Sequence, residues 1–261
     1  MREHITDRTS NTCKEGRDMY IQIEKTAELF DRAVAMAVTR QIMAKPDSLI
    51  GLATGTTTIG PHSWLVRLAR DLNIDYSRVK TVNLDEYVGL APDDPKSCRY
   101  RIDEQLLNHV NIDKCNTYVP DGLRTPIEDE IQVFRDTIDR FGGIDLQILS
   151  IGTNGHIAFN EPGTPFNSSL YIAKISDSTL DAKTDFFGGD RNAVPRAGIT
   201  MGIKDIMHAR HVLLIAKGKN KASIMKETLT GQVTENVPAS VLQLHPALSV
   251  IMDADAATLL C

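Results

Sequence analysis

The stretch IDLQILSIGTNGHIAFNEPG, residues 144–163, decides the fold class. Its first part, residues 144–151, is predominantly apolar and predicts a buried strand. Three glycines then interrupt regular structure, and the break carries His156 and, five positions later, Glu161. Histidine titrates closest to neutral pH, and a carboxylate can hold its proton and orientation. In open α/β sheets such groups lie just past the carboxyl ends of strands, so the stretch predicts a parallel sheet with its chemistry at this turn.

The rest of the chain repeats the alternation of strand and helix patterns. Strands are predicted at residues 48–53, 79–84, 211–216 and 247–252, and helices at residues 27–44, 59–72, 98–110, 126–141 and 219–230, with a short strand and helix within 198–207. This order predicts an α/β fold: a doubly wound, mostly parallel sheet with helices on both faces, Rossmann-like.

The domain organisation follows from where these patterns weaken. Residues 1–18 are polar and charged and predict a flexible N-terminal extension. Residues 19–261 are expected to form a single α/β catalytic domain. Within it, residues 163–195 are polar and contain Gly188-Gly189, which predicts a mobile lid segment.

Composition excludes several classes of function. The chain has 261 residues and a formal net charge of −5, without a dense Lys/Arg run, which argues against a nucleic-acid partner. No apolar stretch approaches the roughly 20 residues that cross a membrane, and the N-terminus lacks the apolar segment of a secretory signal. The four cysteines are scattered without CxxC spacing, which suits a cytoplasmic protein.

The first chemical motif is the run TGTTT at residues 54–58, between a predicted strand and the next helix. Free amides, hydroxyls and a glycine at a helix start make a cradle for an anion, here formed by Thr54, Gly55, Thr56 and Thr57. The run lacks the signatures of a nucleotide or dinucleotide loop, so it indicates one small phosphate group. The structural alternative is a turn that only caps the helix.

Two adjacent carboxylates, Asp85 and Glu86, follow the predicted strand 79–84 within the run NLDEYVGL, residues 83–90. A carboxylate held at a strand end can abstract a proton next to a carbonyl, as in aldose–ketose isomerisation. The alternative is a pair of solvated turn acids.

Two further positions complete the candidate site. The spacing of His156 and Glu161 is not that of an HExxH metal site, and a lone histidine is more often structural, but its flanking glycines favour a functional role. Lys221, at the start of the helix predicted after strand 211–216, can meet a phosphate as a point charge, or be a solvated surface lysine. All four motifs follow parallel strands, which indicates a small phosphorylated carbonyl substrate and no metal, nucleotide or flavin.

Three runs resemble the glucosamine-6-phosphate deaminase (isomerase) family: NLDEYVGL at residues 83–90, GHIAFNEP at 155–162 and ASVLQLHP at 239–246. The resemblance extends over about residues 20–260. It implies that glucosamine 6-phosphate and water are converted to fructose 6-phosphate and ammonia, without a cofactor.

The resemblance also implies a role for each site residue. His156 would assist opening of the pyranose ring, and Asp85 would move a proton from C2 to C1. Glu161 would hold and tune His156. The phosphate and sugar would be bound by the remaining residues, Thr54, Gly55, Thr56, Thr57, Glu86 and Lys221.

The chain departs from the family pattern at three places. Asn154 stands where many members have an aspartate, so the histidine relay is expected to depend on Glu161. Asp185 stands where the lid often has an arginine, and Lys183, Arg191 and Arg196 are the candidates to replace that cation. Tyr171 and Ala173 stand where allosteric relatives have basic residues, which argues against regulation by the acetylated sugar phosphate.

Several alternatives stay open. The run GITMGIKDI at residues 198–206 and the missing lid arginine also resemble galactosamine-6-phosphate deaminases, whose product would be tagatose 6-phosphate. A 6-phosphogluconolactonase-like hydrolase is disfavoured by the runs at residues 85–87 and 160–162. A non-catalytic sugar-phosphate-binding protein is a further alternative. The expected partner is a small amino-sugar phosphate, with a homo-oligomer left open.

Overall fold

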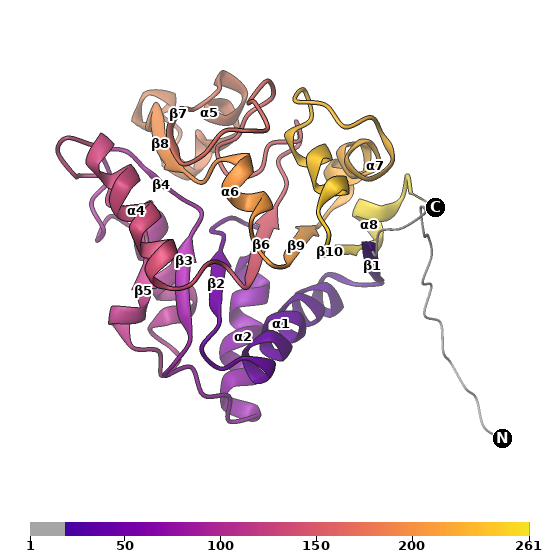
Figure 1. Cartoon of the computed structure of the whole chain (residues 1–261). Helices are drawn as coiled ribbons and strands as arrows, with labels where there is room; N and C mark the ends of the chain where they lie inside the picture. Colours follow the sequence, from indigo (N-terminus) through magenta and orange to yellow (C-terminus); the bar gives the residue numbers. More distant parts are fainter. Residues whose placement is uncertain (1–18, 261) are drawn as a thin grey trace.

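The computed structural model describes residues 19–260, so the predicted extension at residues 1–18 lies outside the described part (Figure 1). Its centre is a seven-stranded sheet in which every pair of neighbours is parallel. In spatial order the strands are β1 (Met19–Glu24), β10 (Leu248–Asp253), β9 (Val212–Ala216), β6 (Leu146–Ser150), β2 (Leu49–Leu52), β3 (Lys80–Asn83) and β5 (Thr117–Tyr118).

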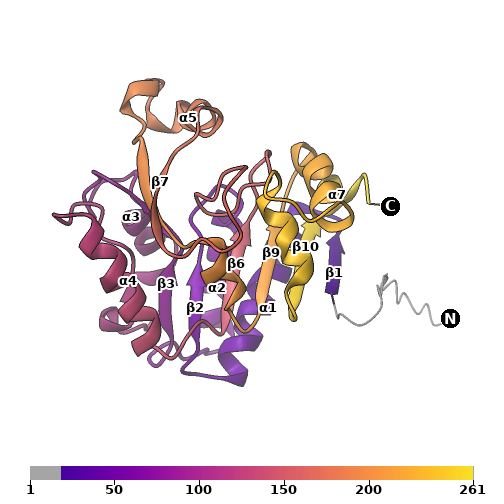
Figure 2. The same ribbon diagram turned by 45° about the horizontal axis from the view of Figure 1, so that its top comes forward.

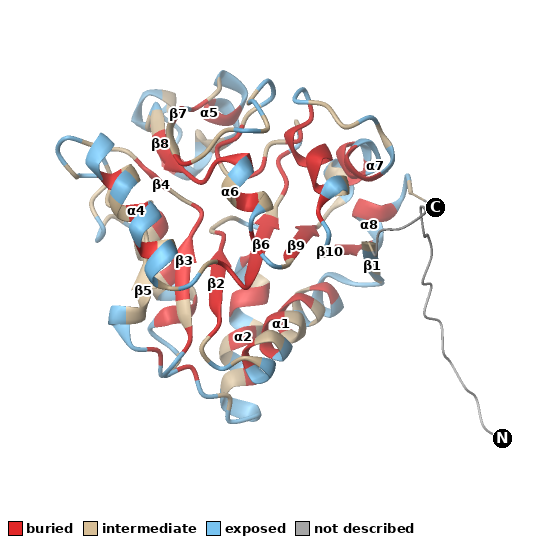
Figure 3. Cartoon of the chain, viewed as in Figure 1, coloured by how far each residue is buried: buried red, intermediate tan, exposed pale blue. Residues whose placement is uncertain are grey.

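Both faces of this sheet are buried, as a parallel sheet requires (Figure 3). Successive residues of a strand point to opposite faces, so the strands feed two separate cores. Leu149 of β6 and Leu214 of β9 belong to one core. Their neighbours Ile148 and Leu213 belong to the other. This alternation explains why the strands are apolar throughout their length.

Helices cover the two faces. The core on one face contains side chains of α1 (Ala27–Ala44) and α2 (Ile59–Asp71), and the core on the other contains side chains of α4 (Glu128–Arg140), α6 (Ile203–Met207) and α7 (Ala222–Thr230). Thr26 caps α1, since its side chain accepts a hydrogen bond from the amide of Leu29. The predicted doubly wound α/β fold is therefore confirmed. Among residues 19–260, no helix is long and apolar enough to cross a membrane.

The strand order places a topological switch point between β2 and β6. After β2 the chain builds outward through β3 and β5, and from β6 it builds in the other direction through β9 and β10. At such a point the loops that leave the two strands diverge and open a crevice at the carboxyl edge of the sheet. The threonine run follows β2 and the glycine turn follows β6, so both predicted motifs meet here.

A second, antiparallel sheet lies above this edge, formed by β4 (Asp85–Tyr87), β8 (Ala197–Thr200) and β7 (Tyr171–Lys174) (Figure 2). The segment 163–195 thus contains ordered elements: β7, α5 (Asp177–Lys183) and two short 3-10 helices. Tyr87, Phe159, Leu180 and Phe187 pack there in a small core of their own. The predicted lid segment is therefore built around a strand, a helix and a core.

Some elements differ from the sequence prediction. The helix predicted at residues 98–110 is shorter, because α3 (Cys98–Ile102) continues only as a π-helical turn at Asp103–Leu107. β1, β4, β5 and β7 were not predicted, because they are short or carry polar residues on exposed edges. The chain also adds α8 (Ala254–Ala257) after β10.

Gly198 tests how tightly the second sheet packs. A Cβ added there would lie 2.3 Å from the ring of Phe159, so Gly198→Ala should lower the free energy of unfolding by about 1–3 kcal/mol. In the control Gly55→Ala, the added Cβ would meet its nearest atom at 3.7 Å and should change stability little. Urea unfolding measures both, and equal stabilities would contradict this packing.

Candidate active site

The carboxyl edge of the main sheet and the second sheet enclose one pocket. It collects side chains from the loop after β2, from β4, from α3, from the turn after β6 and from α5. Its lining includes Thr54, Gly55, Asp85, Cys98, Arg101, Ser150, His156, Thr179 and Lys183. The predicted convergence of the strand-end motifs is thus seen for Thr54, Gly55, Asp85 and His156.

The glycine turn makes room for the imidazole of His156. A Cβ at position 152 would lie 2.2 Å from Cε1 of that ring, so only glycine fits there. Gly155 has a φ of +88°, a left-handed conformation that glycine adopts without strain. The turn is closed by a backbone hydrogen bond from the amide of Gly152 to the carbonyl of His156 at 2.8 Å. The two glycines therefore fix the histidine at the strand end.

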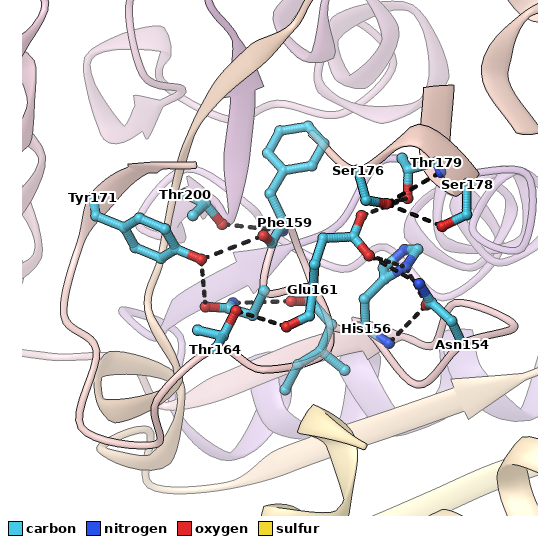
Figure 4. A network of polar contacts seen from close by, with 12 residues as sticks. Asn154, His156, Phe159, Glu161, Thr164, Tyr171, Ser176, Ser178, Thr179 and Thr200 are labelled. Atoms are coloured by element: carbon cyan, nitrogen blue, oxygen red, sulfur yellow. Dashed lines mark hydrogen bonds and ion pairs between the residues drawn. The ribbon is translucent and has the colours of Figure 1, made fainter. Parts of the chain in front are cut away.

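Asn154 bridges His156 and Glu161 (Figure 4). Its Oδ1 lies 2.7 Å from Nδ1 of His156, and its Nδ2 donates to Oε2 of Glu161 at 2.9 Å. The direct distance from Nδ1 to Oε2 is 3.6 Å. The predicted relay of His156 with Glu161 thus includes the amide of Asn154, which carries the hydrogen bond between them.

The bridge also sets the tautomer of His156. A carboxylate only accepts hydrogen bonds, so Glu161 turns the Nδ2 of Asn154 toward itself and Oδ1 toward the imidazole. An oxygen there requires the hydrogen of the neutral ring on Nδ1. The Nε2 atom is then left without hydrogen and can accept a proton.

The surroundings of this pair keep Glu161 ionised and His156 neutral. Burial opposes ionisation of Glu161, but hydrogen bonds from the hydroxyl of Thr179 and the amide of Asn154, together with the attraction of the imidazolium whenever His156 is protonated, outweigh it and lower the pKa of Glu161. Burial lowers the pKa of His156, and Lys221 and Lys183 add to that effect against Glu161. Because Thr179 belongs to α5, the lid segment contributes directly to the histidine network.

Asp85 points into the pocket, and burial raises its pKa to about 6. The thiol of Cys98 donates to its Oδ1 at 3.6 Å. A carboxylate with such a pKa is a stronger base than an exposed one and is still ionised at neutral pH.

Glu86 does not reach the pocket, and its predicted role in substrate binding is wrong. It points to the opposite face of β4, where its carboxylate accepts backbone hydrogen bonds from Tyr87, Cys98 and Arg99 at 2.7–2.9 Å. It is only 2% exposed. Its carboxylate therefore caps α3 and holds that helix beside the pocket.

The threonine cradle is only partly in the pocket. The hydroxyl of Thr54 is buried there without a hydrogen-bond partner among residues 19–260. Thr58 holds the loop closed through the amide and carbonyl of Gly55. Thr56 and Thr57 are not among the residues that line the pocket. Lys221 is not among them either, although its charge lowers the pKa of His156.

The three candidates to replace the missing lid arginine differ in whether they line the pocket and whether they are already paired. Lys183 lines the pocket. Arg191 is paired with two acids of α5, Asp177 and Asp181, and Arg196 donates to Asn192. Asp185, which stands at the position of the missing arginine, is exposed and does not line the pocket.

The sequence motifs did not mark four of these pocket residues: Cys98, Arg101, Ser150 and Thr179. Cys98 and Arg101 are three positions apart, which places them on one face of a helix. That spacing and the preceding NLDEYVGL run were the available signal. Nothing in the local sequence marked Thr179, because its contact with Glu161 depends on how α5 docks.

The family described as glucosamine-6-phosphate isomerases/6-phosphogluconolactonase matches residues 22–250. Glucosamine-6-phosphate deaminase of Thermoanaerobacter pseudethanolicus is 43% identical over 242 residues, which cover 93% of this chain and 95% of that protein. The deaminase of Lachnoclostridium phytofermentans is 49% identical over 220 residues, which cover 84% and 93%.

Solved structures of related proteins have the same fold as this chain. A monomeric glucosamine-6-phosphate deaminase superimposes with a TM-score of 0.90 at 36% identity and covers 92% of this chain and 100% of its own. The 6-phosphogluconolactonase from Trypanosoma brucei has a TM-score of 0.75 at 15% identity and covers 94% and 100%. At that identity the second likeness concerns the fold alone.

The bridge by Asn154 predicts how the pKa of His156 depends on the residue at position 154. Asn154→Asp places a carboxylate against Nδ1 and should raise the pKa of His156 by about one unit or more, since an adjacent negative charge favours the imidazolium. NMR titration of the imidazole measures this, with His156→Gln to assign the signal. Asn192→Asp, on the exposed outer part of the lid segment, should leave that pKa unchanged. A pKa that does not move in Asn154→Asp would contradict the bridge.

Proposed function

This chain belongs to the family of glucosamine-6-phosphate isomerases and 6-phosphogluconolactonases, and we propose that it is a glucosamine-6-phosphate deaminase. It would convert glucosamine 6-phosphate and water to fructose 6-phosphate and ammonia. The observation that carries the proposal is the meeting of Asp85 and His156 in one pocket of a chain that is 43% identical to a protein of that name over nearly its full length.

His156 performs the first step, the opening of the pyranose ring. Its Nε2, free of hydrogen, accepts the proton of the anomeric hydroxyl and returns a proton to the ring oxygen as the bond from C1 to that oxygen breaks. Asn154 and Glu161 stabilise the imidazolium that forms between these two transfers. They hold the Nδ1 hydrogen throughout, so only Nε2 exchanges protons with the sugar.

Asp85 performs the second step on the open chain. It removes the proton from C2, next to the C1 aldehyde, and a proton is returned to C1. The C1 oxygen takes up a proton as C2 loses its own, which gives an enolamine, and the amine nitrogen gives up a proton when C1 is protonated. The net change moves one proton from C2 to C1 and one from nitrogen to the C1 oxygen, so the aldehyde becomes a hydroxymethyl group and the amine at C2 becomes an imine. Water hydrolyses this imine to the ketone and releases ammonia. C1 is reduced as C2 is oxidised, so the isomerisation needs no external oxidant or reductant, and side chains of the pocket and water can supply the proton transfers.

The phosphate orients the sugar. Thr54, Gly55, Thr56, Thr57 and Lys221 are the sequence-based candidates to bind it, and the buried, unpartnered hydroxyl of Thr54 supports a contact at that position. Binding energy from a remote phosphate can hold C1 and C2 against the reacting groups.

Glucosamine is favoured over galactosamine by the names of the relatives, whereas the lactonase alternative is supported only by structures that share the fold.

We place the reaction in the cytoplasm on the basis of cysteine usage. A homo-oligomer stays a prediction, beside a relative described as monomeric. The absence of regulation by an acetylated sugar phosphate also stays a prediction.

An ammonia-release assay with both sugar phosphates tests the proposal. Glucosamine 6-phosphate should be turned over well above galactosamine 6-phosphate. Asp85→Asn and His156→Gln should each lose activity by a factor of about 10²–10⁴, the usual contribution of a general acid or base. Asp93→Asn, which removes an exposed acid from the neighbouring loop, should retain activity. Full turnover by Asp85→Asn would reject the mechanism.

The pH profile tests the state of Asp85. Its base form is lost on protonation, so kcat/KM should fall as the pH drops through about 6. Cys98→Ala removes a hydrogen bond that stabilises the carboxylate, which raises its pKa and should move this acidic limb to higher pH. Cys98→Ser keeps a donor and should leave the limb close to its original position. An unmoved limb in Cys98→Ala would show that the thiol does not act on Asp85.

A further inference from the structure

Two positive side chains line the pocket from opposite parts of the chain. Arg101 belongs to α3 and Lys183 to the last turn of α5. Both are half-buried. Burial and the nearby charge of Arg101 together lower the pKa of Lys183, so the two cations lie close enough to repel each other.

Neither cation has an acidic partner within ion-pair distance among residues 19–260. Other basic side chains of α3 and of the lid segment do have one. Arg99 of α3 pairs with Asp103 at 2.7 Å, and Arg191 pairs with two acids of α5. Two like charges held together in a half-buried site cost free energy unless an anion joins them. The pair is therefore arranged for a negatively charged ligand.

The guanidinium of Arg101 is held in place before any ligand binds. It lies 5.0 Å from the centre of the Phe186 ring, a cation–π distance. Phe186 contacts Phe187 edge-on, and Phe187 in turn packs edge-on against Tyr87 of β4. This aromatic chain ties the lid segment to α3 and β4. A planar guanidinium that is fixed in this way can offer two parallel hydrogen bonds to a phosphate.

The thiol, hydroxyl and carboxylate groups nearby do not remove the need for an anion. Asp85 is the acidic side chain that lines the pocket. Burial raises its pKa, and the charges of Lys183 and Arg101 oppose that effect. Because one carboxylate faces two cations, a net positive charge remains for an anionic ligand. The unpartnered hydroxyl of Thr54 lines the same pocket and adds a donor for an anion.

We propose that Arg101 and Lys183 together bind the phosphate group of the substrate, in place of the single arginine that the lid sequence lacks. The inference rests on the proposed function for the identity of the sugar. It assigns a substrate-binding role to Arg101, which no motif marked, and it selects Lys183 over Arg191 and Arg196.

Calorimetric binding of inorganic phosphate and of fructose 6-phosphate tests the inference without turnover. Arg101→Gln and Lys183→Gln should each weaken both ligands on the order of 10-fold or more, as expected for the loss of a charge-assisted hydrogen bond. Arg101→Lys, which keeps the charge, should recover part of the loss. Arg196→Gln removes a charge just after the lid segment, from a residue that does not line the pocket, and should bind as the unaltered chain does.

Kinetics on glucosamine 6-phosphate give a second readout. A contact made equally in the ground and transition states changes KM and leaves kcat, so both glutamine variants should raise KM with little change in kcat. Unchanged phosphate binding in Arg101→Gln and Lys183→Gln would overturn the inference. A shifted acidic limb with unchanged phosphate affinity in Arg101→Gln would also overturn it, because Arg101 would then act on Asp85.

The two proposals fail separately. A chain that releases ammonia from glucosamine 6-phosphate but binds phosphate without Arg101 and Lys183 keeps its function and loses this inference. A chain that binds inorganic phosphate through both residues but releases no ammonia keeps the inference and loses the function.

Discussion

The side-chain amide of Asn154 is the contact on which the candidate site depends. It accepts from one ring nitrogen of His156 and donates to Glu161, so that the charge of the carboxylate reaches the imidazole without a direct hydrogen bond. A carboxylate at position 154 could not donate to Glu161 and would place two negative charges side by side. The asparagine thus allows Glu161 to remain ionised while His156 stays neutral, with its reactive nitrogen toward the pocket.

The fold supplies the geometry around this contact. Parallel strands bring the loop after β2 and the turn after β6 to one switch point, and the small antiparallel sheet adds Asp85 beside them. Thr179 of α5 holds Glu161 from the other side. The lid segment is therefore part of the proton-transfer network, and it also carries Lys183 into the pocket.

Much of this could be predicted from the sequence, and the exceptions have physical reasons. Strands such as β9 were predicted because burial on both faces makes them wholly apolar, whereas β4 has only three residues, two of them acidic, and β7 is fully buried at only one of its four positions. The error at Glu86 follows from the missed strand: adjacent residues of a strand point to opposite faces, so Asp85 and Glu86 could not both reach the pocket. Arg101 was missed because its role depends on how the lid segment packs against α3.

The central claim is that one pocket holds the sugar's reacting carbons at Asp85 and its phosphate at the cations. A crystal structure with fructose 6-phosphate bound tests this most directly. The account predicts the phosphate in contact with Thr54, Arg101 and Lys183, with C1 and C2 beside the carboxylate of Asp85. A phosphate bound elsewhere on the chain, or C1 and C2 out of reach of Asp85, would contradict it.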